Sequence, residues 1–147
     1  MPLVVADTGP LVSAADRDDR AHELASALVR SAGTDLVVPE PVVVEVDWLL
    51  RSLLGHRPAR VFLAVLVAGR PRRAALTAEQ FARAVEIDRM YADLSLGVPD
   101  ASVMALAEAE RAPILTFDFT HFRATTDRDG RPWRLVIEED VVAQEMR

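Results

Sequence analysis

Short apolar runs alternate with longer helical segments along this 147-residue chain. Residues 3–6, 36–38 and 114–117 are almost wholly apolar and too short to form helices. Between them, apolar residues recur at helical spacing in segments bounded by glycine or proline. Parallel strands need long crossover connections, which are usually helices, so this alternation favours a parallel sheet with helices on both faces. The pattern therefore predicts an α/β fold.

Helices are expected at residues 20–31, 39–54, 58–68, 78–93 and 99–111. Residues 74–76 and 135–137 are candidates for further strands, and residues 141–146 for a last helical turn. Thr8 is expected to cap a helix that begins at Gly9-Pro10, and residues 119–132 are expected to form a polar loop. A chain of this length with 50% hydrophobic residues and no linker predicts one domain over residues 1–147.

Composition excludes several classes of protein. The chain has no cysteine, which excludes disulfides and thiolate metal sites and fits a reducing compartment. The longest apolar stretch, residues 61–68, is too short to span a bilayer, and the first residues resemble a strand rather than an export signal, so we expect no export. A net charge of −6 argues against a general nucleic-acid binder. All 17 basic residues are arginine, which excludes chemistry that needs a lysine ammonium group. We expect a cytoplasmic protein.

Four carboxylates stand within or beside apolar sequence: Asp7, Glu45, Asp100 and Asp118. Asp7 and Asp118 each follow a predicted strand, and ligands of open parallel sheets bind beyond the carboxyl ends of the strands. Each could also be a turn or cap residue. Their common placement nevertheless predicts that they share a site.

Glu45 and Asp100 are predicted to point inward from helices. Glu45 shares a helix face with Val42 and Leu49 and has no basic residue within helical reach. A carboxylate such as Asp100 is favoured at a helix N-terminus, which alone could explain its position. However, Val103 and Met104 lie on the same helix face, which directs Asp100 towards the interior. Asp47 differs, because Arg51 four residues later gives it an ordinary surface partner; we assign it no role.

Clustered carboxylates would need a cation or protons to be stable. At about 5 Å and an effective dielectric of about 20, each like-charge pair costs on the order of 3 kcal/mol. Six such pairs would rival the whole stability of a domain. Ligation by oxygen alone favours Mg²⁺ or Mn²⁺, and such ions commonly act on phosphates. The four acids therefore predict a metal site for phosphate chemistry.

The chain resembles the PIN-domain ribonucleases, specifically the VapC-type toxins of bacterial type II toxin–antitoxin systems. The resemblance spans nearly the whole chain and rests on segments that occur in the family's order and spacing. These segments are residues 4–11, 41–45, 91–94, 96–102 and 114–118, the last followed by His121 and Phe122.

The resemblance implies a three-layer α/β/α sandwich with a short, mainly parallel central sheet. It also implies an endoribonuclease that requires Mg²⁺ or Mn²⁺, an RNA substrate, a cognate antitoxin and a homodimer. Asp7 and Asp100 would be the main metal ligands, and Glu45 and Asp118 would complete the site. Three residues would support or border the ligands: Thr8, Thr116 and Asp93. The arginine-rich insertion at Arg70, Arg72 and Arg73 could contact RNA phosphates.

Two other functions remain open. A PIN-like module that binds RNA or protein without catalysis would be expected to have lost some of the acids, whereas all four are present. An Asp-based phosphotransfer domain would need a lysine and an adjoining acid, whereas this chain has Asp7-Thr8-Gly9 and no lysine. DNA rather than RNA as the substrate is harder to exclude.

Overall fold

The computed structural model describes residues 3–146 and contains a four-stranded sheet in the order β3-β2-β1-β4. Its strands are β1 (Val4–Ala6), β2 (Leu36–Pro39), β3 (Arg72–Ala74) and β4 (Ile114–Leu115). Every pairing is parallel; β1 is central, with Val4 opposite Leu36 and Val5 opposite Ile114. The predicted α/β fold with a short parallel sheet is confirmed.

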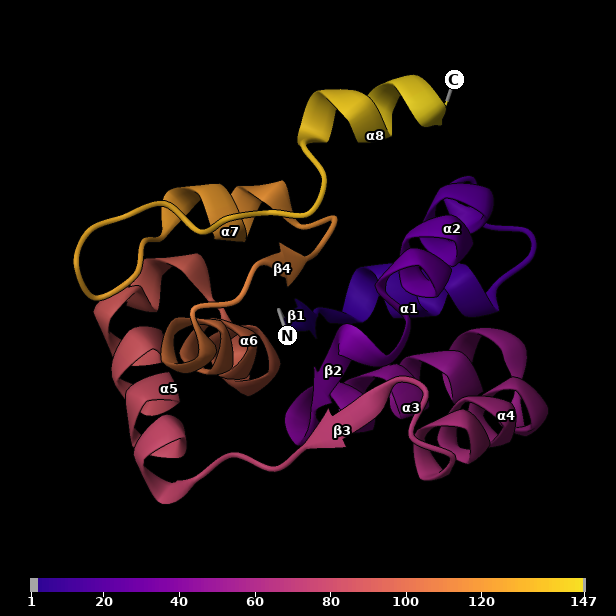
Figure 1. Cartoon of the computed structure of the whole chain (residues 1–147), viewed down its shortest axis with the longest axis horizontal. Helices are drawn as coiled ribbons and strands as arrows, with labels where there is room; N and C mark the ends of the chain where they lie inside the picture. Colours follow the sequence, from indigo (N-terminus) through magenta and orange to yellow (C-terminus); the bar gives the residue numbers. More distant parts are fainter. Residues whose placement is uncertain (1–2, 147) are drawn as a thin grey trace.

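Helices connect the strands and cover the sheet on both sides (Figure 1). They are α1 (Thr8–Ala15), α2 (His22–Ala32), α3 (Glu40–Leu54), α4 (His56–Val67), α5 (Ala78–Met90), α6 (Gly97–Glu110), α7 (Phe119–Ala124) and α8 (Glu139–Glu145). The helices α5 and α6 pack against each other on one side of the sheet, and α1 to α4 lie on the other. Within residues 3–146, none of these helices is long and apolar enough to cross a bilayer.

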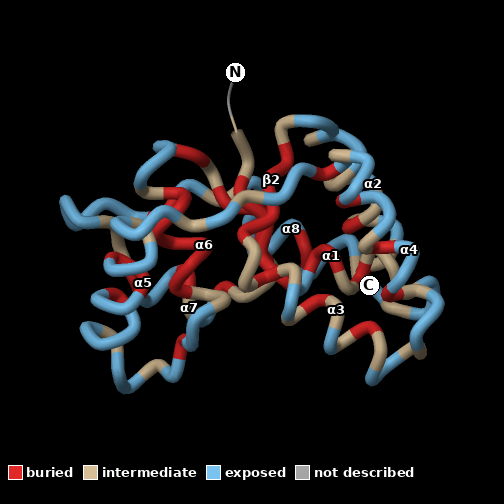
Figure 2. Tube along the Cα trace, turned by 90° about the horizontal axis from the view of Figure 1, so that it is seen from below, coloured by how far each residue is buried: buried red, intermediate tan, exposed pale blue. Residues whose placement is uncertain are grey.

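The core lies around the strands and α6. Val5, Leu36 and Ile114 are completely buried, and Figure 2 shows the buried trace running through the centre of the molecule. Every residue of α6 from 101 to 107 is buried as well. Because the middle of α6 is enclosed, the helix holds Asp100, in its first turn, firmly beside the ends of the strands.

Four local expectations need correction. Thr8 is not the cap of α1: Asp7 occupies the N-cap, and its side chain makes no capping hydrogen bond. The third strand is residues 72–74 rather than 74–76, because two exposed arginines rather than apolar residues pair with β2. Residues 135–137 form only an isolated bridge, between Leu135 and Ile114. The segment 119–132 is not all loop, since it begins with α7.

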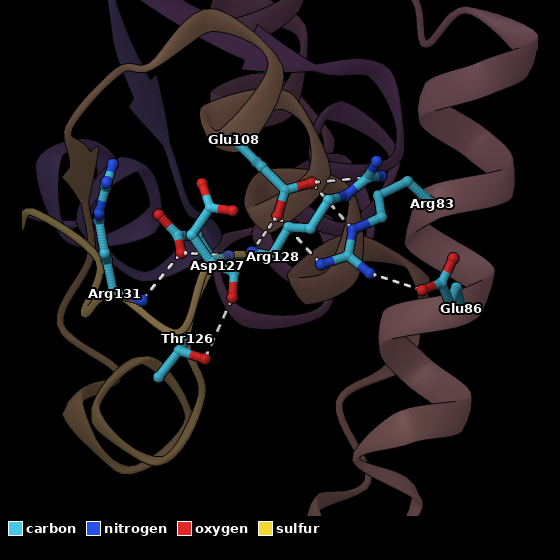
Figure 3. Close-up of polar contacts among 8 residues, drawn as sticks. Arg83, Glu86, Glu108, Thr126, Asp127, Arg128 and Arg131 are labelled. Carbon is cyan, nitrogen blue, oxygen red and sulfur yellow. Dashed lines mark hydrogen bonds and ion pairs between the residues drawn. The ribbon is translucent and has the colours of Figure 1, made fainter.

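A network of ion pairs joins α5, α6 and the turn at residues 127–131 (Figure 3). The buried Arg83 guanidinium donates hydrogen bonds to both oxygens of Glu108, at 2.9 and 3.0 Å, and contacts Glu86. Glu108 also accepts a hydrogen bond of 2.7 Å from the backbone of Arg128. The carboxylate of Asp127 accepts bonds from two backbone amides of the turn. Glu108 thus ties three segments together at the end of α6 opposite Asp100.

We expect Arg83→Ala to destabilise the protein by about 3 kcal/mol, because the substitution leaves the partly buried Glu108 without its main counter-charge. Urea denaturation measures this change. Arg89→Ala removes an exposed arginine from the same helix and is the control, with an expected change of less than about 0.5 kcal/mol. Equal effects of the two substitutions would contradict a stabilising role for the network.

Candidate active site

The four predicted carboxylates lie around one open cavity of about 450 Å³. Asp7 directly follows β1, and Asp118 comes three positions after the end of β4. Asp100 lies in the first turn of α6, and Glu45 projects from α3. The residues that line the cavity are Asp7, Thr8, Gly9, Glu45, Asp100, Phe117 and Asp118. The four acids therefore converge at the carboxyl ends of the strands, as predicted.

Asp7 is the most deeply buried of these acids, with 4% of its surface exposed. Its backbone amide donates to the carbonyl of Leu115 at 2.9 Å, which fixes the end of β1 against β4. Its Oδ2 accepts a hydrogen bond of 2.7 Å from the hydroxyl of Thr116, while its Oδ1 is buried and has no hydrogen-bond partner among the residues that the structure describes. A buried oxygen without a partner is costly, and a cation or a proton would satisfy it.

Thr116 connects two of the acids. Its fully buried hydroxyl donates to Asp7 and accepts a hydrogen bond of 2.9 Å from the backbone amide of Asp118. This arrangement holds the two carboxylates at the ends of neighbouring strands. The hydroxyl of Thr116 therefore links the carboxylate of Asp7 to the backbone of Asp118.

Asp118 begins α7 and brings a histidine into the cluster. Its Oδ1 accepts a hydrogen bond of 3.0 Å from the backbone amide of His121, which caps the helix. The imidazole Nδ1 of His121 lies 2.8 Å from Oδ2 of Asp100 and 2.9 Å from Oδ2 of Asp118. One atom from each of Asp100, Asp118 and His121 forms a group in which all distances are within 4.8 Å. The structure thus brings Asp100 closest to Asp118 and His121.

The pKa values of the site reflect burial and crowding. Burial raises the pKa of Asp7 to about 7; the hydrogen bond from Thr116 opposes this shift, and the charges of Asp100 and Asp118 add to it. Burial also raises the pKa of Asp100, with the bond to His121 opposing and the charges of Asp118 and Glu45 adding to the shift. Burial lowers the pKa of His121, but its contacts with Asp100 and Asp118 outweigh this, so the net shift is upward.

This arrangement fits a divalent cation. The carboxylates offer several oxygen donors to one cavity, and no arginine lines that cavity among residues 3–146. The unpartnered Oδ1 of Asp7, and the burial that raises the pKa values of Asp7 and Asp100, indicate that the protein alone does not fully stabilise these carboxylates in their charged form. Hard oxygen donors of this kind suit Mg²⁺ or Mn²⁺.

The remaining predicted site residues lie at different distances from the cavity. Thr8 lines it, and its buried hydroxyl has no hydrogen-bond partner. Asp93 is exposed in the short 3-10 turn Ala92–Leu94 and does not line the cavity. The three arginines of the insertion are also outside it; Arg72 donates to the carbonyl of Thr34, and Arg73 pairs with Glu40 at 2.8 Å. Their contact with RNA stays a prediction.

His121 is the residue that sequence reasoning missed as a site member. The segment after Asp118 was expected to be a loop, so nothing fixed the direction of this side chain. The available signal was its spacing: a residue three positions after a capping aspartate lies on the first turn of the helix, beside the cap. The contact with Asp100, 21 residues earlier, depends on the tertiary fold.

The sequence model of the PIN domain matches residues 4–127 of the chain. The chain therefore belongs to the PIN-domain family. It is 31% identical to ribonuclease VapC26 of Mycobacterium tuberculosis over 122 residues, which cover 82% of this chain and 90% of the relative. The resemblance to PIN domains and VapC-type proteins that the sequence indicated is confirmed.

Solved structures agree in fold. VapC20 of Mycobacterium tuberculosis, a toxin that cleaves the sarcin-ricin loop, superimposes with a TM-score of 0.72 at 21% identity, covering 80% of this chain and 93% of that one. A toxin–antitoxin complex from Klebsiella pneumoniae contains a chain that matches with a TM-score of 0.61 at 17% identity, covering 90% of this chain and 99% of that one. At these identities the similarity concerns the fold.

Proposed function

We propose that this protein is an endoribonuclease that requires Mg²⁺ or Mn²⁺ and acts as the toxin of a toxin–antitoxin pair. The observation that carries the proposal is the convergence of Asp7, Glu45, Asp100 and Asp118, from segments far apart in sequence, on one cavity of a PIN domain. The name of its relative, ribonuclease VapC26, supports RNA as the substrate, and a structure of similar fold is that of a toxin that cleaves the sarcin-ricin loop.

The side chains of the cavity have distinct tasks in this proposal. Asp7, Asp100 and Asp118 hold the divalent ion, with Glu45 completing the negative charge of the cavity. Thr116 fixes the orientation of Asp7 through its hydroxyl and that of Asp118 through its backbone amide. A divalent ion bound there supplies Lewis-acid stabilisation of the charge that develops on the phosphate and on the leaving oxygen.

The partners follow from the same reasoning. Solved relatives of similar fold include complexes of a toxin with its antitoxin, so we propose a cognate antitoxin that restrains this nuclease in the cytoplasm. We also propose a homodimer, as the family resemblance implies. A module that binds RNA without cleaving it has less support, because such a module has no need to retain four acids around one cavity.

Metal removal tests the proposed activity. We expect purified protein to cleave RNA in Mg²⁺ or Mn²⁺ and to lose about a hundredfold or more of its rate in EDTA, because an ion of this kind contributes several kcal/mol to the transition state. Added metal should restore the rate. Gel analysis of a labelled RNA and of a DNA with the same sequence measures cleavage and separates the two substrates. Undiminished cleavage in EDTA would overturn the metal requirement.

A further inference from the structure

We propose that His121 is itself a ligand of the divalent ion, through Nδ1, and that this nitrogen makes the site favour Mn²⁺ over Mg²⁺. The inference rests on the proposed metal-dependent function and adds a ligand beside that cavity, where His121 contacts Asp100 and Asp118. It adds a nitrogen donor to a site that sequence reasoning treated as built from oxygen alone.

The first argument is the spacing of the donor atoms. Nδ1 of His121 lies 2.8 Å from Oδ2 of Asp100 and 2.9 Å from Oδ2 of Asp118. Two ligands at a right angle around an ion with bonds of about 2.1 Å are about 3.0 Å apart. The separation of Nδ1 from each of the two oxygens is therefore already near that of neighbouring ligands of one ion.

The second argument concerns hydrogen bonding. A neutral imidazole nitrogen carries at most one hydrogen, so Nδ1 cannot fully satisfy the oxygens of both Asp100 and Asp118. The contact of Nδ1 with Asp100 has the geometry of a hydrogen bond, whereas its contact with Asp118 is close in distance only. A cation among the three atoms would satisfy all of them at once.

The third argument is the rigid support of the imidazole. Asp118 caps the first turn of α7 by accepting a hydrogen bond from the backbone amide of His121. The backbone of Leu94 also lies close to the imidazole. Metal-bound histidines are commonly oriented by a backbone carbonyl or a carboxylate behind them. The unpartnered, buried Oδ1 of Asp7 in the same cavity independently points to a missing cation.

Nitrogen ligation predicts a particular metal preference. Mg²⁺ prefers oxygen ligands and retains its water, whereas imidazole suits transition metals, and affinities for nitrogen donors rise along the first transition row. A site that adds one imidazole to its carboxylates therefore discriminates in favour of Mn²⁺. Without the imidazole, the same carboxylates would discriminate less.

The deciding experiment uses the full-length protein, freed of metal and then loaded with Mn²⁺ at about pH 8.5, where an imidazole is largely neutral. Pulsed electron paramagnetic resonance detects the coupling between Mn²⁺ and a directly bound nitrogen nucleus. We expect nitrogen coupling in the wild-type protein and its loss in His121→Asn, which places an amide oxygen near the position of Nδ1. His56→Gln is the control, since His56 is exposed at the start of α4 and bonded to Arg51.

Calorimetric titration gives an independent measurement. Loss of the nitrogen ligand should lower the affinity for Mn²⁺ about tenfold or more, with a smaller change for Mg²⁺. Wild-type protein that binds Mn²⁺ without nitrogen coupling would overturn the inference alone and leave His121 as a counter-charge to the carboxylates. Wild-type protein that binds no Mn²⁺ would overturn both the inference and the metal-dependent function. The wild-type spectrum decides the question even if a variant fails to fold.

Discussion

Asp7→Asn and Asp100→Asn should each lower the rate of RNA cleavage by about a thousandfold, which corresponds to roughly 4 kcal/mol of transition-state stabilisation. Each substitution removes one negative charge and one strong oxygen donor from the cavity while keeping the size of the side chain. If the protein arrests growth when it is produced without its antitoxin, both variants should relieve that arrest. Cleavage of a labelled RNA at saturating Mg²⁺ measures the enzymatic effect.

Asp47→Asn is the matched control for these variants. Asp47 lies on α3 two residues after Glu45, but it pairs with Arg51 at 2.9 Å and does not line the cavity. It should therefore change neither cleavage nor growth arrest. Circular dichroism must show that the three variants are folded. Cleavage near the wild-type rate in both Asp7→Asn and Asp100→Asn would rule out catalysis by the carboxylate cluster.

In the absence of metal, the free energy of unfolding should fall by roughly 3 kcal/mol between about pH 5 and pH 8, owing to Asp7 alone. Its pKa in the folded protein is about 7, above its ordinary value of 3.8. In this window the folded protein therefore binds more protons than the unfolded chain, so stability decreases as pH rises. The raised pKa values of Asp100 and His121 act with the same sign.

Urea denaturation in EDTA at several pH values measures this dependence. In Asp7→Asn the fall in stability with pH should be much smaller, whereas Asp47→Asn should keep the wild-type slope. Saturating Mg²⁺ should oppose the fall, because an ion that binds only the folded state stabilises it. Metal-free stability that rises with pH, or an unchanged slope in Asp7→Asn, would contradict the placement of this carboxylate in a crowded, buried site.

The sequence was sufficient to predict the central strands and the convergence of the four acids. Strands β1, β2 and β4 are largely buried, so their sequences are apolar and can be recognised. Asp7 and Asp118 could be placed at the carboxyl ends of β1 and β4 because each follows such an apolar run. Glu45 could be oriented because the helical period of α3 assigns it a face. These predictions succeeded where burial imposes a pattern on consecutive residues.

The sequence was insufficient where tertiary contacts decide the structure. Strand β3 carries two exposed arginines at the edge of the sheet and has no apolar pattern. Helix α7 has only six residues, too few to display a period, and depends on the cap from Asp118. The contact between His121 and Asp100 requires α6 and α7 to meet, which local sequence does not specify.

The hydroxyl of Thr116 determines where a proton can reside on Asp7. The amide of Asp118 can only donate, so the single hydrogen of this hydroxyl is directed to Oδ2 of Asp7. While that hydrogen bond is in place, a proton on Asp7 resides on Oδ1, the oxygen that has no partner among residues 3–146. An arriving cation would expel that proton, so metal uptake by this protein should acidify an unbuffered solution and should weaken as the medium becomes more acidic.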